Sequence, residues 1–136
     1  MNRQAMDQVM VDHFTYEAQD DVDGVLSTLT DDVVHEVVGA PWTPLTGTDA
    51  VRPMYEQLFQ NLKGTGVEPV TRWYGDGFVV DDTIWSGRIE DGGVFGFPGR
   101  SGNVSFRLLH VFEFRGDLIS KEVVWCDTVT IGRQLD

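Results

Sequence analysis

The order of periodic segments along the chain predicts an α+β fold, with helices packed on one face of a curved antiparallel sheet. Apolar residues recur at helical spacing in three segments before Gly64, and the rest of the chain shows the alternation and turn signals of strands. The 136 residues, 41% of them hydrophobic, are enough for a core that contains a pocket. We therefore expect a single domain over residues 1–136.

The first expected helix spans residues 4–18. His13 lies on its apolar stripe, and Tyr16 follows one turn later, so we expect both side chains to face the interior. The other members of the stripe are Met6, Val9, Met10 and Phe14.

Two more helices and a short strand complete the first half of the chain. Asp20 or Asp21 can cap the second helix, and the third is expected to begin at Thr48 or Asp49 and to be ended by Gly64 and Gly66. The β-branched run 33–38 predicts a strand between them, followed by a loop that holds Trp42.

The second half of the chain reads as strands. We expect them over residues 67–74 and 78–89, and in a final hairpin over residues 104–129. The glycine-rich segment 91–102 is too long for a tight turn, so it predicts a loop that overhangs a pocket.

The final hairpin places two titratable groups on one largely apolar face. If Arg115 pairs with Leu118 across the tight turn and the strands contain no bulge, His110 and Asp127 share that face. They are then about four residues apart, or on the order of 13 Å at about 3.3 Å per residue, with Trp125 between them. This spacing predicts two ends of one cavity rather than a hydrogen-bonded pair.

All three histidines of the chain are expected to project toward that cavity. His35 lies on the inward phase of its strand and Glu36 on the other, and His13 and His110 occupy inward positions. Histidine exchanges protons near neutral pH, which suits an acid or a base. No short spacing typical of metal ligands occurs among the histidines, so we expect neither a metal nor another cofactor.

Charge and cysteine content limit the partners and the compartment. A formal net charge of -12 argues against nucleic acid or an anionic membrane surface as a partner. Cys126 is the one cysteine, so no intrachain disulfide forms and a reducing compartment is expected. The N-terminus lacks the apolar core of a signal peptide and no apolar run approaches a membrane span, which predicts a cytoplasmic protein.

Three motifs carry a resemblance to the nuclear-transport-factor-two-like superfamily. This superfamily includes ketosteroid isomerase, scytalone dehydratase, limonene epoxide hydrolase and the SnoaL-type polyketide cyclases. The resemblance implies a cone-shaped curved antiparallel sheet, with three N-terminal helices enclosing an apolar pocket. The motifs are Asp21-Val-Asp-Gly24 through Thr30-Asp-Asp-Val33, Gly47-Thr-Asp-Ala-Val51, and Trp125-Cys-Asp127 followed by Gln134-Leu135.

The resemblance also implies roles for single residues. Against the ketosteroid isomerases, the oxyanion-hole tyrosine falls at His13, the second oxyanion donor at His110 and a pocket aromatic at Trp125. The catalytic base falls at Val37, which argues against a steroid-isomerase mechanism. SnoaL-type cyclases carry an acid/base aspartate on the last strand, before a terminal Gln-Leu, and Asp127 resembles that position.

These observations predict a small enzyme that needs no cofactor and applies acid/base chemistry to a hydrophobic metabolite, as a cyclase, isomerase, dehydratase or hydrolase. Asp127 is the expected principal acid/base, and His110 and His35 are expected to polarise or protonate an oxygen. The expected ligand-binding residues are His13, Trp125, Phe112, Tyr16 and Trp42.

Two further expectations concern alternatives and assembly. The same pocket could belong to a non-catalytic module for ligand binding or dimerisation, which would not need an ionisable Asp127. By resemblance we expect a homodimer formed across the outer face of the sheet, where Leu109, Val111 and Val124 are predicted to lie.

Overall fold

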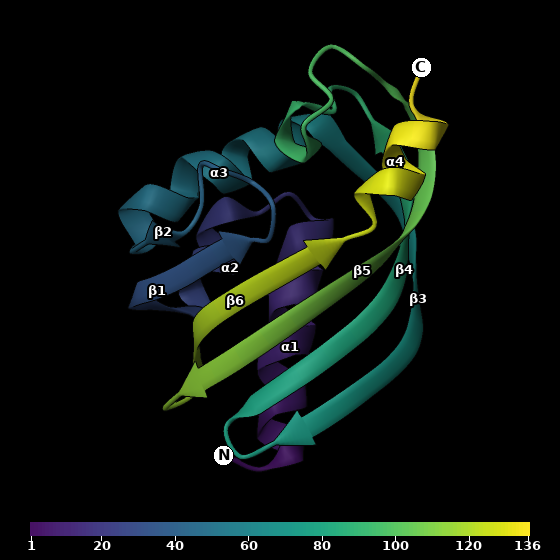
Figure 1. Cartoon of the computed structure of the whole chain (residues 1–136). Coiled ribbons are helices and arrows are strands. Elements are labelled where there is room, and N and C mark those ends of the chain that lie inside the picture. The colour runs from purple at the N-terminus through teal and green to yellow at the C-terminus, as the bar shows by residue number, and fades with distance from the viewer.

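The structure of the protein is a computed structural model that describes residues 1–136, and it confirms the α+β cone (Figure 1). One six-stranded sheet runs in the order β2-β1-β6-β5-β4-β3, and every neighbouring pair is antiparallel except β1 and β6. The elements in order are α1 (Arg3–Ala18), α2 (Val22–Ser27), β1 (Leu29–Val37), β2 (Leu45–Thr46), α3 (Thr48–Asn61), β3 (Leu62–Gly75), β4 (Phe78–Ile89), η1 (Gly93–Phe95), β5 (Gly102–Arg115), β6 (Leu118–Cys126) and α4 (Thr128–Gln134).

The first three helices pack on the concave face of the sheet and form the main core. Capping fixes where two of them begin: the Asn2 side chain accepts a hydrogen bond from Ala5 N, and the Asp21 side chain accepts one from Gly24 N. The buried members of this core are Met6, Met10, Val25, Leu29, Val33, Val51, Tyr55, Phe59, Val79, Phe112 and Ile119.

Helix α3 ends earlier than the glycines predicted. It stops at Asn61, and Leu62 already has an extended backbone and pairs with Ile89 in the sheet. Gly64 lies inside β3, where the strand pairing shifts and the sheet bends. Gly64 therefore serves close backbone packing: a Cβ atom on the opposite Gly87 would lie 2.9 Å from the Gly64 Cα.

The hairpin of β5 and β6 contains a bulge that the bulge-free prediction missed. Arg115 pairs with Leu118 as predicted, but Phe114 pairs with Ile119 and Glu113 with Lys121, so Ser120 has no partner. Side chains alternate between faces along a strand, so one extra residue reverses the face of every residue that follows.

The chain end also differs from the prediction. The last strand stops at Cys126, and residues 128–134 form α4 in place of further strand. The helix contributes Ile131, and the residue after it, Leu135, joins the same second, smaller core. Its other buried members are Ile89, Val104 and Phe106. No helix of the structure is long and apolar enough to cross a membrane.

Candidate functional site

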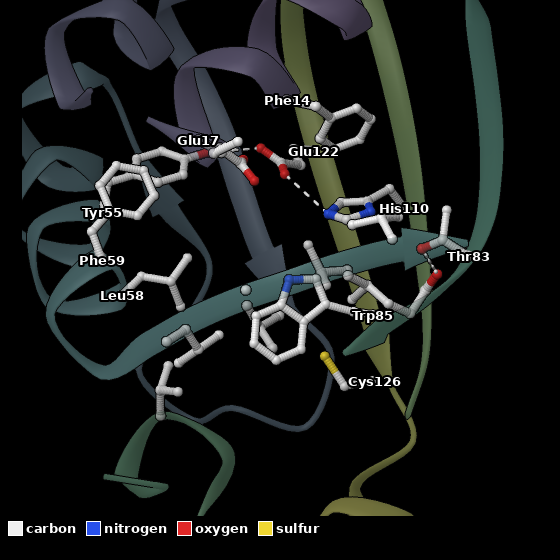
Figure 2. Close-up of a pocket in the computed structure, with 18 of the residues that line it drawn as sticks. Phe14, Glu17, Tyr55, Leu58, Phe59, Thr83, Trp85, His110, Glu122 and Cys126 are labelled. Carbon is white, nitrogen blue, oxygen red and sulfur yellow. Dashed lines mark hydrogen bonds and ion pairs between the residues drawn. The ribbon is translucent and has the colours of Figure 1, made fainter. Parts of the chain in front are cut away.

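A cavity of about 710 Å³ occupies the wide part of the cone, between the concave face of the sheet and α1, α3 and the segment around η1 (Figure 2). Val94 and Phe95 of that segment line it, which confirms that the glycine-rich loop borders the pocket. Most of the wall is apolar, a composition typical of sites for hydrophobic small molecules. Its larger apolar side chains are Phe14, Trp42, Met54, Leu58, Phe59, Trp85, Phe106 and Leu108.

Ionisable side chains form a row across the sheet at the floor of the cavity. Neighbouring strands contribute one inward-facing residue each, and strand pairing brings them together: Arg72 faces Asp81, and Asp81 faces His110. On the other side of β5, Glu122 of β6 faces His35 of β1. The row therefore gives the otherwise apolar cavity a charged floor.

Glu122 is the centre of the site. Its carboxylate is almost completely buried, at 2% exposure, and the Tyr55 hydroxyl donates a hydrogen bond to Oε2 over 2.9 Å. The Nε2 atoms of His13 and His35 lie 3.7 Å and 4.0 Å from Oε2, and Nε2 of His110 lies 3.6 Å from Oε1. All three histidines lie around this carboxylate, which was not predicted, but only His35 and His110 line the cavity as expected.

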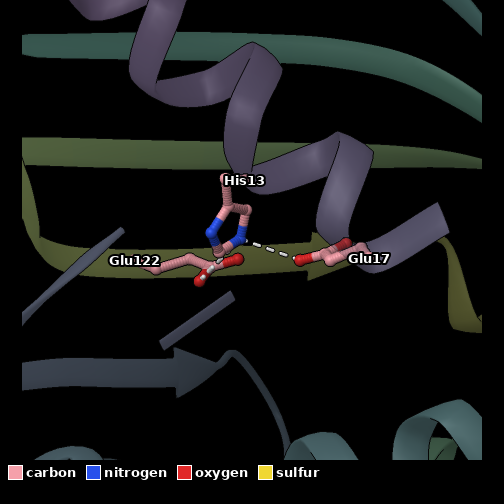
Figure 3. Close-up of side chains that lie close together, drawn as sticks. All are labelled: His13, Glu17 and Glu122. Atoms are coloured by element: carbon pink, nitrogen blue, oxygen red, sulfur yellow. Dashed lines mark ion pairs between the residues drawn. The ribbon is translucent and has the colours of Figure 1, made fainter. Parts of the chain in front are cut away.

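His13 carries the positive charge of this cluster (Figure 3). The Thr28 hydroxyl donates its only proton to Val25 O, so at its 2.8 Å contact with His13 Nδ1 it accepts, and Nδ1 is protonated. Nε2 lies 2.8 Å from Glu17 Oε1 and also faces Glu122, which favours a second proton. Burial alone would lower the pKa of His13, but the two carboxylates outweigh it and raise the pKa to about 10.

The charged His13 sets the protonation of its neighbours. Burial alone would raise the pKa of Glu122, but His13, followed by His35 and His110, holds it well below its usual range. Burial lowers the pKa of His35, which is neutral at pH 7 as a result. Ligand atoms of His13, Glu17 and Glu122 lie within 4.8 Å of one another, a spacing that could hold a metal ion, but His13 with both ring nitrogens protonated has no lone pair to bind one.

A second ionic network flanks the other end of the row. Arg72 Nε donates to Asp81 Oδ1 over 2.8 Å, and Arg72 Nη1 donates to Asp7 Oδ1 over 2.9 Å. The Tyr74 hydroxyl donates to the same Asp7 oxygen over 2.7 Å. Asp81 Oδ2, in contrast, is closed off from solvent and has no hydrogen-bond partner.

The predicted site residues differ in how they lie relative to the cavity. His35, His110 and Trp42 line it as expected. His13, predicted to bind ligand, is fully buried behind the floor and does not line the cavity; its Nε2 lies 3.7 Å from Glu122, which does.

Two aromatic residues predicted to contact ligand do not line the cavity. Phe112 is buried in the main core beneath the stacked His110 ring, so the prediction that it contacts ligand directly is wrong. Tyr16 packs against the same core, and its predicted contact with ligand is wrong for the same reason. Phe112 thus supports the floor through the His110 ring, whereas the Tyr16 ring lies against Gly24 of α2.

The placement predicted for Asp127 and Trp125 is wrong, because the bulge reverses their side of the sheet. Asp127 is exposed at the N-terminus of α4, where it accepts hydrogen bonds from the backbone and the hydroxyl of Thr130. The Thr130 hydroxyl is the main cause that lowers the pKa of Asp127. Trp125 pairs with Leu109 and is 43% exposed, whereas Val124, predicted on the outer face, lines the cavity.

Sequence reasoning missed Glu122, Tyr55, Asp81 and Glu17 as members of the site. Tyr55 and Asp81 lay on segments expected to be helix and strand, but nothing local marked them as polar partners in the interior. One signal could have found Glu122: it is the sole carboxylate between Ile119 and Cys126 on the last strand. If the strand continued to residue 127, one phase would place Glu122 on the inner face and the other phase would place Asp127 there.

The sheet is mostly antiparallel and cone-shaped, and it encloses an apolar cavity whose floor carries ionisable groups. This arrangement is typical of a class of folds that bind small molecules. The sequence profile of the SnoaL-like domain matches residues 10–122, so the chain belongs to the SnoaL-like family. No functionally curated protein matches the sequence.

Solved structures agree with this assignment at the level of the fold. A proposed SnoaL-like polyketide cyclase from Shewanella denitrificans is similar with a TM-score of 0.80 at 15% identity, over 98% of this chain and 97% of that one. TsrD from Streptomyces laurentii has a TM-score of 0.78 at 18% identity, covering 98% and 96%. An LEH-like epoxide hydrolase from M. tuberculosis has a TM-score of 0.69 at 17% identity, covering 93% and 85%.

Proposed function

We propose that the protein is an enzyme that transfers protons to and from a hydrophobic small molecule without the help of a cofactor. The observation that carries the proposal is the pair of cavity-lining histidines, His35 and His110, whose Nε2 atoms flank the buried Glu122 carboxylate at 4.0 Å and 3.6 Å. In this arrangement the histidines exchange the proton. Glu122 replaces Asp127 as the carboxylate of the site.

The electrostatics of the floor suit proton abstraction. His35 is neutral at pH 7 because burial lowers its pKa, so it can accept a proton. The imidazolium that forms is stabilised by Glu122, by roughly 4 kcal/mol for a separation of about 4 Å at an effective dielectric of about 20. Glu122 itself stays ionised, since its pKa is held well below the usual range by the histidines despite its burial.

The shape of the cavity indicates the substrate class. Aromatic and aliphatic side chains form most of the wall, ionisable groups gather on the floor, and Asp20 and Lys63 form an ion pair elsewhere in the lining. A largely apolar molecule with one carbonyl group and an acidic C–H bond beside it would direct that end to the histidines. Cyclisation, isomerisation, dehydration and hydrolysis reactions can all start from such a proton transfer, in line with the cyclase and hydrolase names of the structural neighbours.

Exchange of carbon-bound hydrogen in D₂O tests the proposal with model ketones in place of the natural substrate. A panel of hydrophobic ketones is incubated with the protein, and loss of the signal of the hydrogen beside the carbonyl is followed by NMR. We expect catalysed exchange of at least one ketone, lowered about 100-fold or more by His35→Asn or His110→Asn. Asp127→Asn is the matched control and should leave the rate unchanged.

A non-catalytic ligand-binding module remains the competing function, because the same cavity could hold a ligand without turnover. Its signature is saturable quenching of tryptophan fluorescence by panel members, with Trp85 and Trp42 in the wall as reporters, and no catalysed exchange. Exchange that persists in the His35→Asn/His110→Asn double variant would contradict the enzymatic proposal.

We also propose that the protein forms a homodimer through the convex face of the sheet. Trp73 and Trp125 are 51% and 43% exposed there, and Leu109 and Val111 lie between them on the same face. An exposed apolar patch of this kind is typical of an interface. Sedimentation should show a dimer that Trp125→Arg dissociates, whereas Val129→Arg, at an exposed position on α4, should leave it intact.

A further inference from the structure

One oxygen of the buried Glu122 carboxylate has no hydrogen-bond partner. The Tyr55 hydroxyl donates to Oε2 over 2.9 Å, whereas Oε1 accepts no hydrogen bond and lies 3.6 Å from His110 Nε2. Glu122 is 2% exposed and lines the cavity, and Oε1 is not among the buried atoms that are closed off from solvent. A buried acceptor without a donor is costly, so Oε1 is a place where a ligand in the cavity can donate a hydrogen bond.

A second carboxylate, Glu17 in the last turn of α1, lies beside Glu122. Glu17 Oε1 is 2.8 Å from His13 Nε2, and this nitrogen and one oxygen of each carboxylate lie within 4.8 Å of one another (Figure 3). Both carboxylates line the cavity, and His13 is the one cation between them. We call these three residues the acidic corner, because two negative charges there face a single positive charge.

The other cations that line the cavity do not neutralise the acidic corner, because each has a carboxylate of its own. Arg72 donates to Asp81 over 2.8 Å and to Asp7 over 2.9 Å. Lys63 Nζ lies 3.8 Å from Asp20 Oδ2. The cavity therefore keeps a net negative charge at one end of its floor.

We propose that the cavity binds hydrophobic molecules that carry a protonated amine, and that Glu122 and Glu17 hold the ammonium group. Glu122 Oε1 accepts one of its N–H bonds, and Glu17 supplies the second negative charge. The rings of Phe14 and Tyr55 line the cavity here and pack edge-on against His13, with centroids 5.7 Å and 6.3 Å away. These rings contribute apolar surface next to the ammonium group (Figure 2).

A cation suits the acidic corner better than a neutral donor or an anion. A hydroxyl group could donate to Oε1 but would leave the net charge of the corner in place. A carboxylate would be repelled by Glu17 and Glu122, and the net charge of -12 repels anions over a longer range as well. An ammonium group brings a donor and a positive charge together, and such charge-assisted hydrogen bonds are stronger than neutral ones.

The inference concerns what the cavity binds, so it goes beyond the proposed proton transfer. It holds for an enzyme and for a ligand-binding module alike. A substrate of this class would direct its ammonium group to the acidic corner, while its hydrophobic part would lie against the apolar wall.

Three ligands that share one skeleton test the preference for a cation: adamantylmethylamine, adamantylmethanol and adamantanecarboxylate. Their dissociation constants are measured by calorimetry at pH 6, with the fluorescence of Trp85 in the cavity wall as a second readout. We expect the amine to bind at least about tenfold more tightly than the alcohol, and the carboxylate to bind most weakly. Equal affinities of amine and alcohol, or no saturable binding of the amine, would overturn the inference.

Glu17→Gln assigns the preference to the acidic corner. At pH 6, below the ordinary histidine pKa of about 6.5, His13 stays protonated in the variant, so exactly one negative charge is lost. We expect amine affinity to fall about tenfold while alcohol affinity stays the same. Asp12→Asn is the matched control, since it removes one charge at an exposed position of α1 outside the cavity and should keep the preference. A preference that survives Glu17→Gln would contradict the assignment to this corner.

This inference and the enzymatic proposal fail separately. Absence of ketone exchange in the wild-type protein would remove the enzymatic function but leave the amine preference measurable. Catalysed exchange without an amine preference would overturn the inference alone.

Discussion

Glu122 lies in the middle of β6 and Asp127 directly after its last residue, so the two carboxylates are five positions apart, yet their surroundings are opposite. Glu122 is buried beneath the cavity, with one tyrosine hydroxyl and three imidazole rings around it. Asp127 is exposed and caps a seven-residue helix. The histidines lower the pKa of Glu122 and keep it ionised although it is buried. Hydrogen bonds from Thr130 lower the pKa of the exposed Asp127.

A single unpaired residue accounts for this contrast. Ser120 is the extra residue of the bulge, and it reverses which of the following side chains face the cavity. A carboxylate on the inner face needs partners from other elements, and α1, α3 and β5 supply them. A carboxylate beyond the last strand pair needs only the local N–H groups of the helix it begins.

The largest expected effect comes from neutralising the buried carboxylate. Glu122→Gln leaves the charged His13 without one of its two partners, and removal of one member of a buried ion pair costs about 3–5 kcal/mol. The free energy of unfolding from urea denaturation measures it. Asp127→Asn, which keeps a capping oxygen, should change the same free energy by less than about 0.5 kcal/mol. Equal losses of unfolding free energy in the two variants would contradict a buried, ion-paired Glu122 and an exposed Asp127.

An intermediate effect is expected from alkaline pH. The pKa of His13 is raised from 6.5 to about 10, so its stabilising contribution is fully present below pH 6.5 and is lost as the pH rises toward 10. One such group gives a slope of at most about 1.4 kcal/mol per pH unit. Thermal or urea unfolding between pH 6 and pH 10, in steps of about one unit, measures the decline.

Glu17→Gln provides the matched comparison for this pH effect. Glu17 lies 2.8 Å from His13 Nε2 and is partly exposed, so the variant should fold while the raised pKa of His13 moves back toward 6.5. The decline in stability should then end at a lower pH than in the wild type. An unchanged profile would show that His13 is not charged in the folded protein.

The smallest expected effect is local to α4. Asp127→Ala removes the cap of this helix and should destabilise the protein by about 1 kcal/mol, whereas Asp127→Asn keeps most of that stability. Urea denaturation separates the two. A loss with Asp127→Ala as large as that of Glu122→Gln would mean that Asp127 has buried partners, contrary to its exposed position.

Much of the fold could be predicted from local patterns. The helical stripe of α1, the tight turn between Arg115 and Leu118, and the glycine-rich loop beside the cavity are all confirmed. Each depends on residues close together in the sequence, where spacing and turn chemistry are decisive. The end of α3 was predicted wrongly because Leu62 gains more from pairing with Ile89 in the sheet than from another helical turn.

The α+β class, the family resemblance and the inward position of His35 and His110 could be predicted from the sequence, because they follow from periodicity and from residues that are present or absent. The buried place of His13 and the carboxylate that the three histidines surround depend on the tertiary structure. The choice of carboxylate depends on the unpaired Ser120 in β6, and strand pairing that shifts by one residue leaves no mark in the local pattern. The fold class follows from local sequence patterns in many segments, whereas the site depends on contacts between residues far apart in the sequence: His13, His35, His110 and Glu122.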